Sequence, residues 1–251
     1  MPSLQLIVLA SAVFLLAGII KGVVGLGLPT LSMALLALWM PPVEAAALLI
    51  LPSFVTNVWQ LRPWSALGPV LRRVAGLQVG IALGTLGGAW FFGAPAGAAG
   101  ARTLLGAALL GYAVWGLAGR SFGAFMLGPQ RARWLGPCAG LCTGVVTALT
   151  GVFVVPAVPY LHALGLQRDA FVQAMGVSFT TATVALAAGL AGTGNYQAAD
   201  VPLSLVLLLP ALAGMALGQR LRERLPLAVF RRCFFGGLGL LGAYLMLGLG
   251  P

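Results

Sequence analysis

The chain is short of charged side chains, and acidic residues are the scarcest among them. It contains 4 Asp and Glu against 14 Lys and Arg, and charged residues make up 7% of its 251 residues, where a soluble domain carries about a quarter. Hydrophobic residues make up 60%, and the mean hydropathy is +1.03. This composition excludes a soluble domain and predicts an integral membrane protein. The long apolar runs are typical of transmembrane helices rather than of barrel strands.

The side chains from which most enzymes build an active site are nearly missing. A single histidine, His162, stands at the end of an apolar segment. The few acids also stand at segment ends: Glu44, Asp169, Asp200 and Glu223. These residues provide no Ser-His-Asp set, no carboxylate pair and no metal cluster. We therefore expect that the protein is not an enzyme and holds no cofactor and no metal ion.

Cysteine is also scarce, and its spacing does not indicate a site. Cys138, Cys142 and Cys233 give no even disulfide framework. Cys138 and Cys142 have the spacing of one helix face, but no histidine or acid stands beside them. We expect these two to be small, buried apolar residues rather than ligands or thiol donors.

Positive charge is the only charge in excess, with a net charge of +10. The arginines stand in short loops between apolar runs, which is the pattern of the positive-inside rule rather than of a surface that binds nucleic acid. The rule places the arginines of 62–73, 120–133, 168 and 220–232 in the cytoplasm. It therefore predicts a multi-pass protein of the plasma or inner membrane with both termini outside, and no nucleic-acid partner.

The most unusual stretch lies inside an apolar run from Leu4 to Met40. The run is too long for one span and short for two, and its glycines and a proline interrupt any helix. This predicts a broken hairpin with its turn or unwound middle at Gly22–Gly27, either re-entrant or fully spanning. Irregular backbone at membrane depth is tolerated only under cover of protein or in a water-filled cavity.

Lys21 places an ionisable group within this run. Such a group is by default a functional hypothesis, and here its ammonium would line the pathway of an anion. The alternative is a lysine that snorkels to the headgroups. The return leg Leu28–Met40 covers only about 20 Å as a helix. The turn should therefore stop short of the cytoplasm, which favours Lys21 inside the membrane.

A second broken run, Leu135–Gly165, shows that the chain has two similar halves. We assign residues 1–119 to a first membrane repeat, 120–134 to a cytoplasmic linker and 135–251 to a second repeat. After its broken run, each half continues with three expected spans, which are Val43–Leu61, Val74–Gly93 and Ala101–Gly119, then Ala170–Gly192, Val201–Gly218 and Phe234–Gly250.

The halves match in residues as well as in order. Ser53 and Thr56 recur as Ser178 and Thr181 at one common shift, and Gly27 matches a glycine of the second broken run. Under the positive-inside rule, equivalent spans run in opposite directions. The predicted fold class is an all-α polytopic membrane protein with two inverted-topology repeats, each a broken or re-entrant helix hairpin plus three transmembrane helices.

The polar groups of the breaks and of two spans can hold an anion at the midplane. Broken helix ends aim free N–H groups and positive dipole ends at such a ligand, and hydroxyl and amide groups can donate to its oxygens. The candidate substrate-binding residues are Lys21, Gly25, Gly27, Thr30, Ser53, Thr56, Asn57, Thr147, Thr150, Gly151, Ser178 and Thr181. The alternative is that the hydroxyls bond to their own helix or join helices.

On one helix face, Ser53, Thr56 and Asn57 form a polar group that we expect to face Ser178 and Thr181 across the two halves. The Gly80-x-x-x-Gly84 motif predicts a close helix-packing face elsewhere.

Several motifs of the chain are shared with a known family. The first half contains Gly22-x-x-Gly25-x-Gly27, Pro-Pro-x-x-Ala through Pro41–Ala45, and a polar face that ends in Asn57-x-x-Gln60. The second half contains Gly144, Thr150-Gly151 and Pro156. With these motifs, nearly the whole chain resembles the sulfite exporter TauE/SafE family. The resemblance implies a plasma-membrane permease for small anions such as sulfite or organosulfonates.

The expected function is that of a secondary transporter for a small anion, held at the midplane between the repeats and moved by alternating access. The alternative is a non-transporting membrane subunit or a channel-like pore. The expected partners are a small anionic substrate and the lipid bilayer. The sequence does not determine the identity of the substrate, whether it is exported or imported, or whether H+ or Na+ is the coupling ion. A homodimer is possible but is not determined either.

Overall fold

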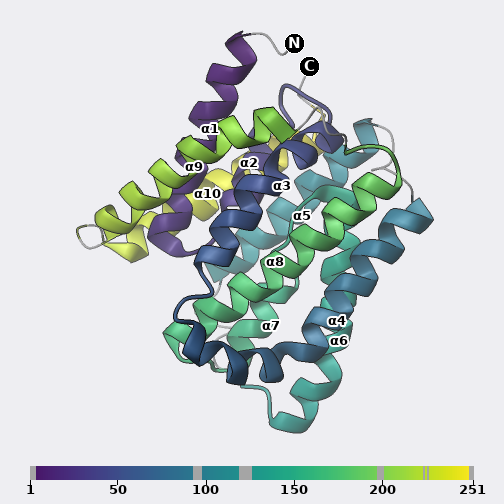
Figure 1. Cartoon of the computed structure of the whole chain (residues 1–251), viewed down its shortest axis with the longest axis vertical. Helices are drawn as coiled ribbons and strands as arrows, with labels where there is room; N and C mark the ends of the chain where they lie inside the picture. The colour runs from purple at the N-terminus through teal and green to yellow at the C-terminus, as the bar shows by residue number, and fades with distance from the viewer. Residues whose placement is uncertain are drawn as a thin grey trace.

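The computed structural model describes residues 4–92, 98–118, 126–196, 201–222, 224 and 226–248, and its regular secondary structure there is entirely helical (Figure 1). In chain order, the elements are α1 (Leu4–Val24), α2 (Leu28–Leu36), α3 (Pro42–Trp59), η1 (Trp64–Ala66), α4 (Leu67–Phe92), α5 (Ala98–Ala118), α6 (Pro129–Thr150), α7 (Ala157–Ala163), α8 (Arg168–Gly192), α9 (Val201–Arg222) and α10 (Leu227–Met246).

The protein is a multi-pass membrane protein by the length and composition of its helices. In the described part of the chain, seven helices are long and apolar enough to cross a membrane, namely α1, α3, α4, α5, α8, α9 and α10. The all-helical fold class predicted from the sequence is confirmed for these residues.

The first apolar run is broken where its glycines predict. α1 ends at Val24 and α2 begins at Leu28, and Gly27 between them has a φ of 109°. This left-handed conformation is open to glycine and strained for residues with a Cβ. With nine residues, α2 covers about 14 Å, which is half of the hydrocarbon core.

The second run is broken in the same way. α6 ends at Thr150 with Gly151 at a φ of 68°, and the seven-residue helix α7 begins at Ala157. The non-helical residues Val152, Phe153 and Val154 between them are almost completely buried. Protein therefore covers the irregular backbone, as membrane depth requires.

Two helices begin earlier than the sequence indicates. α4 was expected from Val74 but begins at Leu67, so that Arg72 and Arg73 lie on the helix rather than in a loop. α6 begins at Pro129, ahead of the expected Leu135. Proline fits the first helical position because its missing N–H is not needed there. Long arginine side chains can reach polar surroundings from a helix end.

Three pairs of long helices pack along each other: α1 with α9, α4 with α6, and α5 with α10. The first two pairs approach at glycines. A Cβ added at Gly22 would clash with the carbonyl oxygen of Met215, and one added at Gly80 would clash with that of Pro137. Small residues at such crossings let helix backbones meet closely. The packing face predicted at Gly80 and Gly84 is confirmed.

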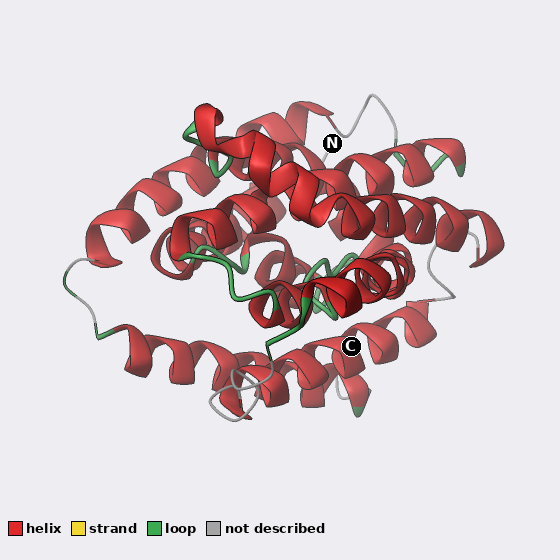
Figure 2. Ribbon diagram, turned by 90° about the horizontal axis from the view of Figure 1, so that it is seen from below, coloured by secondary structure: helices red, strands yellow, loops and turns green. Residues whose placement is uncertain are grey.

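The short helices lie in the interior of this arrangement. Leu28, Met33 and Leu36 of α2 are fully buried, and the rings of Phe153 and Phe179 pack with centroids 6.4 Å apart. Figure 2 shows loop segments in the middle, with long helices around them.

The expectation of buried cysteines is wrong. Cys138, Cys142 and Cys233 are all exposed on the protein surface. The reason is their position on α6 and α10, whose outer faces would meet lipid, and lipid accepts a small apolar side chain as readily as a protein core does.

Candidate functional site

The chain's single lysine is held inside the protein. Lys21 lies in the last turn of α1, and its side chain is only 3% exposed. Its Nζ donates a hydrogen bond to Thr56 Oγ1 at 3.1 Å and another to Asn57 Oδ1. Among the residues that the structure describes, Lys21 forms no ion pair. The ammonium does not snorkel to a surface in this structure, and its described partners are neutral.

Both partners of Lys21 stand on α3 and are fully buried. Thr56 donates its hydroxyl hydrogen to the carbonyl oxygen of Pro52 at 2.7 Å, which leaves its oxygen free to accept from Lys21. Asn57 uses its other end as a donor to Thr183 Oγ1 on α8, at 3.4 Å. One chain of polar contacts therefore joins α1, α3 and α8 inside the protein.

The end of α3 also holds the first helix break in place. Gln60 Nε2 donates to the carbonyl oxygen of Gly25 at 2.8 Å. From α8, Gln173 Nε2 donates to the carbonyl oxygens of Leu61 and Pro63, at 3.0 and 2.8 Å. Together, these two amides fix the break and the end of α3 against α8.

Several predicted site residues have unused hydrogen-bonding groups. The hydroxyls of Thr30 and Ser32 on α2 and of Ser53 on α3 are fully buried and have no hydrogen-bond partner among the residues that the structure describes. A buried hydroxyl without a partner costs free energy. The role that the sequence predicts for Thr30 and Ser53, donating to a ligand, stays a prediction.

The predicted residues at the second break serve the backbone. Thr147 Oγ1 donates to the carbonyl oxygen of Thr143 at 2.8 Å, and Thr150 Oγ1 donates to that of Val146 at 2.7 Å. Thr150 also accepts from the backbone N–H of Val152 at 3.2 Å. With Gly151 in the left-handed conformation, they stabilise the end of α6 and the start of the non-helical segment.

The prediction that Ser178 and Thr181 of α8 face the polar side chains of α3 is wrong, although α8 does pack against α3. Ser178 accepts from Gln78 on α4 at 2.9 Å, and Thr181 donates back to Val177 of its own helix at 3.1 Å. The residue of α8 that meets the polar face of α3 is Thr183. Residues 178 and 183 point about 140° apart on a helix, so α8 presents one of them to α4 and the other to α3.

A basic cavity lies against the first break. Its volume is about 260 Å³, and Val23, Val24 and Leu26 form one side. Its basic lining residues are Arg168, Arg222, Arg231 and His162. A neighbouring cavity of about 820 Å³ shares Arg168 and Arg222 and adds Arg62 and the acidic Asp169. Positive potential in a cleft raises the local concentration of anions.

A lysine buried among neutral partners beside a helix break, in a multi-pass membrane protein, is a pattern that membrane transporters commonly show. A family model described as "Sulfite exporter TauE/SafE" matches residues 10–245. The chain therefore belongs to the TauE/SafE family, a family of membrane transporters for sulfite-type anions and not of enzymes. No curated protein and no solved structure matches it significantly.

Proposed function

We propose that the protein is a secondary transporter that binds a small oxyanion beside Lys21 and moves it by alternating access. The substrate class is sulfite, an organosulfonate or a related carboxylate. The observation that carries this proposal is the burial of the Lys21 ammonium, whose hydrogen-bond partners among the described residues are the neutral Thr56 and Asn57.

A charge at this depth is costly unless an opposite charge approaches it. A lysine at the centre of a transmembrane helix costs about 2.5–3.5 kcal/mol even in the most lenient scale. An anion beside Lys21 would offset this cost, and the unused hydroxyls of Thr30, Ser32 and Ser53 would donate to its oxygens. Gly25 and Gly27 would let the backbone of the break approach the anion closely.

The remaining predicted residues have supporting roles in this proposal. Thr147, Thr150 and Gly151 would shape the second break on the opposite side of the substrate. Ser178 and Thr181 would keep α8 in register with its neighbours. Asn57 joins the Lys21 side to α8 through Thr183, so it would sense the relative position of the two halves.

Two inverted-topology repeats would supply the moving parts of alternating access. In the proposed repeats, α6 is the equivalent of α1, and α9 is the equivalent of α4. The helix pairs support this symmetry, because α1 packs on α9 and α6 packs on α4. Both crossings use glycines one turn apart on each helix, which are Gly18 and Gly22 with Gly214 and Gly218, and Gly140 and Gly144 with Gly80 and Gly84.

The basic cavity beside the first break would be the cytoplasmic entrance to the site. The arginines of three segments line it together with its neighbour: Arg62, Arg168, Arg222 and Arg231. The positive-inside rule places this end of the molecule in the cytoplasm and both termini outside.

Purified protein in liposomes tests the function. Vesicles loaded with radiolabelled sulfite should release it with saturable kinetics when unlabelled sulfite or a small sulfonate is present outside, whereas protein-free vesicles should not. Chloride serves as the control anion. A channel-like pore would release sulfite without saturation and without counterflow. A non-transporting subunit would release none, and either result would contradict the proposal.

A further inference from the structure

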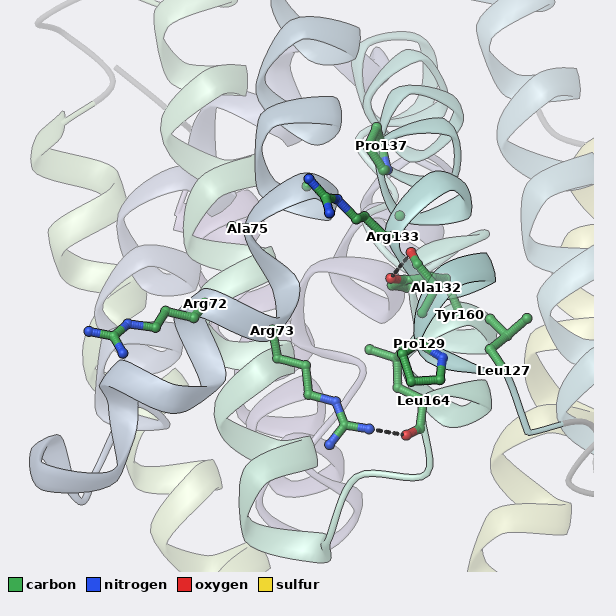
Figure 3. A pocket seen from close by; sticks show the side chains of 12 residues that line it. Arg72, Arg73, Ala75, Leu127, Pro129, Ala132, Arg133, Pro137, Tyr160 and Leu164 are labelled. Carbon is green, nitrogen blue, oxygen red and sulfur yellow. Dashed lines mark hydrogen bonds between the residues drawn. The ribbon is translucent and has the colours of Figure 1, made fainter.

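A second basic cavity lies at the start of α6, away from Lys21. It has a volume of about 740 Å³ and lies between the first turns of α4, the first turns of α6 and the end of α7. Its basic residues are Arg72, Arg73 and Arg133 (Figure 3). Arg73 turns to the carbonyl oxygen of Leu164, to which its Nη2 donates at 2.7 Å.

The positive charge of this cavity is not compensated. Within the described part of the chain, Arg72 and Arg133 form no hydrogen bond or ion pair through their guanidinium groups, and the lining contains no acid. In Figure 3, both side chains extend freely away from the Arg73–Leu164 contact. Arginine binds phosphate through two parallel hydrogen bonds, which suits such free groups to a phosphate ligand.

An apolar cavity adjoins the basic one. It measures about 440 Å³ and shares the side chains of Leu127 and Tyr160 with the basic cavity. Along the same helix, α6 exposes large apolar side chains: Trp134 at 74%, Leu135 at 46% and Leu141 at 48%. Trp134 also lines a surface hollow together with Arg133. A ligand that fits here has a negative head and an apolar tail.

We propose that an anionic phospholipid binds at the start of α6, with its phosphate in the basic cavity at Arg72 and Arg133. Its acyl chain follows the exposed apolar side of α6 past Trp134. Basic pockets between transmembrane helices are typical sites for such headgroups. A free phosphate ion would bind the arginines but would not contact the apolar surface.

The site is separate from the transport site. Lys21 donates its hydrogen bonds to Thr56 and Asn57, which do not line this cavity, and the cavity at the first helix break shares no lining residue with it. Loss of lipid binding and loss of sulfite transport are therefore distinguishable, and either proposal can fail without the other.

Tryptophan fluorescence tests the proposal in phosphatidylcholine nanodiscs. Phosphatidylglycerol with brominated chains should quench Trp134 at low mole fraction, while brominated phosphatidylcholine at the same fraction should not. The Trp134→Phe variant identifies the part of the signal that belongs to this residue. In the Arg72→Gln/Arg133→Gln variant, half-maximal quenching should need about 30-fold more phosphatidylglycerol, since each arginine near an anionic headgroup contributes about 1 kcal/mol.

The matched control is Arg220→Gln/Arg232→Gln, which removes two exposed arginines that line neither cavity. It should bind phosphatidylglycerol as the wild type does. Equal quenching by both brominated lipids, or an equal loss in the control variant, would overturn the proposal. Displacement of the lipid by equal concentrations of glycerol phosphate would show that the ligand is a free phosphate, and this would overturn it too.

Discussion

The Lys21→Met substitution separates the charge of the proposed site from its shape. Methionine keeps most of the side-chain length but can no longer donate to Thr56 and Asn57 or attract an anion. A hydrogen bond to a charged group contributes about 1.5–3 kcal/mol. Its loss should therefore lower the affinity for sulfite about 10-fold to 150-fold, and transport at low sulfite concentration should fall by the same factor.

The stability of the same variant should change little. Without the ammonium, Asn57 Oδ1 loses its donor, which costs about 1–3 kcal/mol. Removal of the buried charge also removes the cost of its desolvation, which acts in the opposite direction. These two effects have opposite sign, so we expect a melting temperature close to that of the wild type.

The assay is sulfite counterflow in liposomes, run beside a thermal melt of the same preparation. Arg220→Met serves as the control, because it removes one exposed positive charge. Transport at wild-type rates by Lys21→Met would refute the role of the charge. A collapsed melting temperature would refute the stability argument and would make Lys21 a structural residue.

Further predictions concern the polar link, the helix crossings and the orientation. Asn57→Leu should abolish sulfite transport while the protein still folds, because it removes the bonds to Lys21 and Thr183; counterflow and melting measure this, and normal transport would contradict it. Gly80→Ala should lower the free energy of unfolding by about 1–3 kcal/mol through overpacking, whereas Gly87→Ala, with open space around it, should not; equal melts would contradict the crossing. In a cysteine-free background, an impermeant thiol reagent should label Leu4→Cys from outside but not Arg224→Cys, and the reverse result would overturn the orientation.

Sequence alone located the breaks in the apolar runs, since glycine and proline mark them directly. It placed two helix starts too late, because arginines in the first turns of α4 and α6 resemble a loop when only hydropathy is considered. A helix end at a membrane surface tolerates these residues, since their long side chains reach outward.

The sequence marked Lys21, Thr56 and Asn57 as candidate site residues but did not predict the hydrogen bonds between them. Lys21, Thr56 and Asn57 share the interior because an ionisable group within an apolar run must find polar partners, and the nearest polar helix face supplies them. Thr183 and Gln78 were missed because the rotation of α8 decides which of its hydroxyls meets α3. Spacing fixes relative angles on one helix but does not fix how that helix is turned against its neighbours.

The helix ends around Lys21 explain how the protein can hold the cation before an anion arrives. Lys21 lies in the last turn of α1, and Thr56 and Asn57 lie near the end of α3. Both helices therefore direct the negative end of their dipoles toward the ammonium, each with about 0.3–1 kcal/mol at exposed sites. These contributions are smaller than the cost of burying the charge. Without an anion, they therefore offset that cost only in part. Beyond the break, α2 begins with its positive end and the unused hydroxyl of Thr30. An oxyanion between the ammonium and the start of α2 would satisfy both, which makes the break itself part of the proposed binding site.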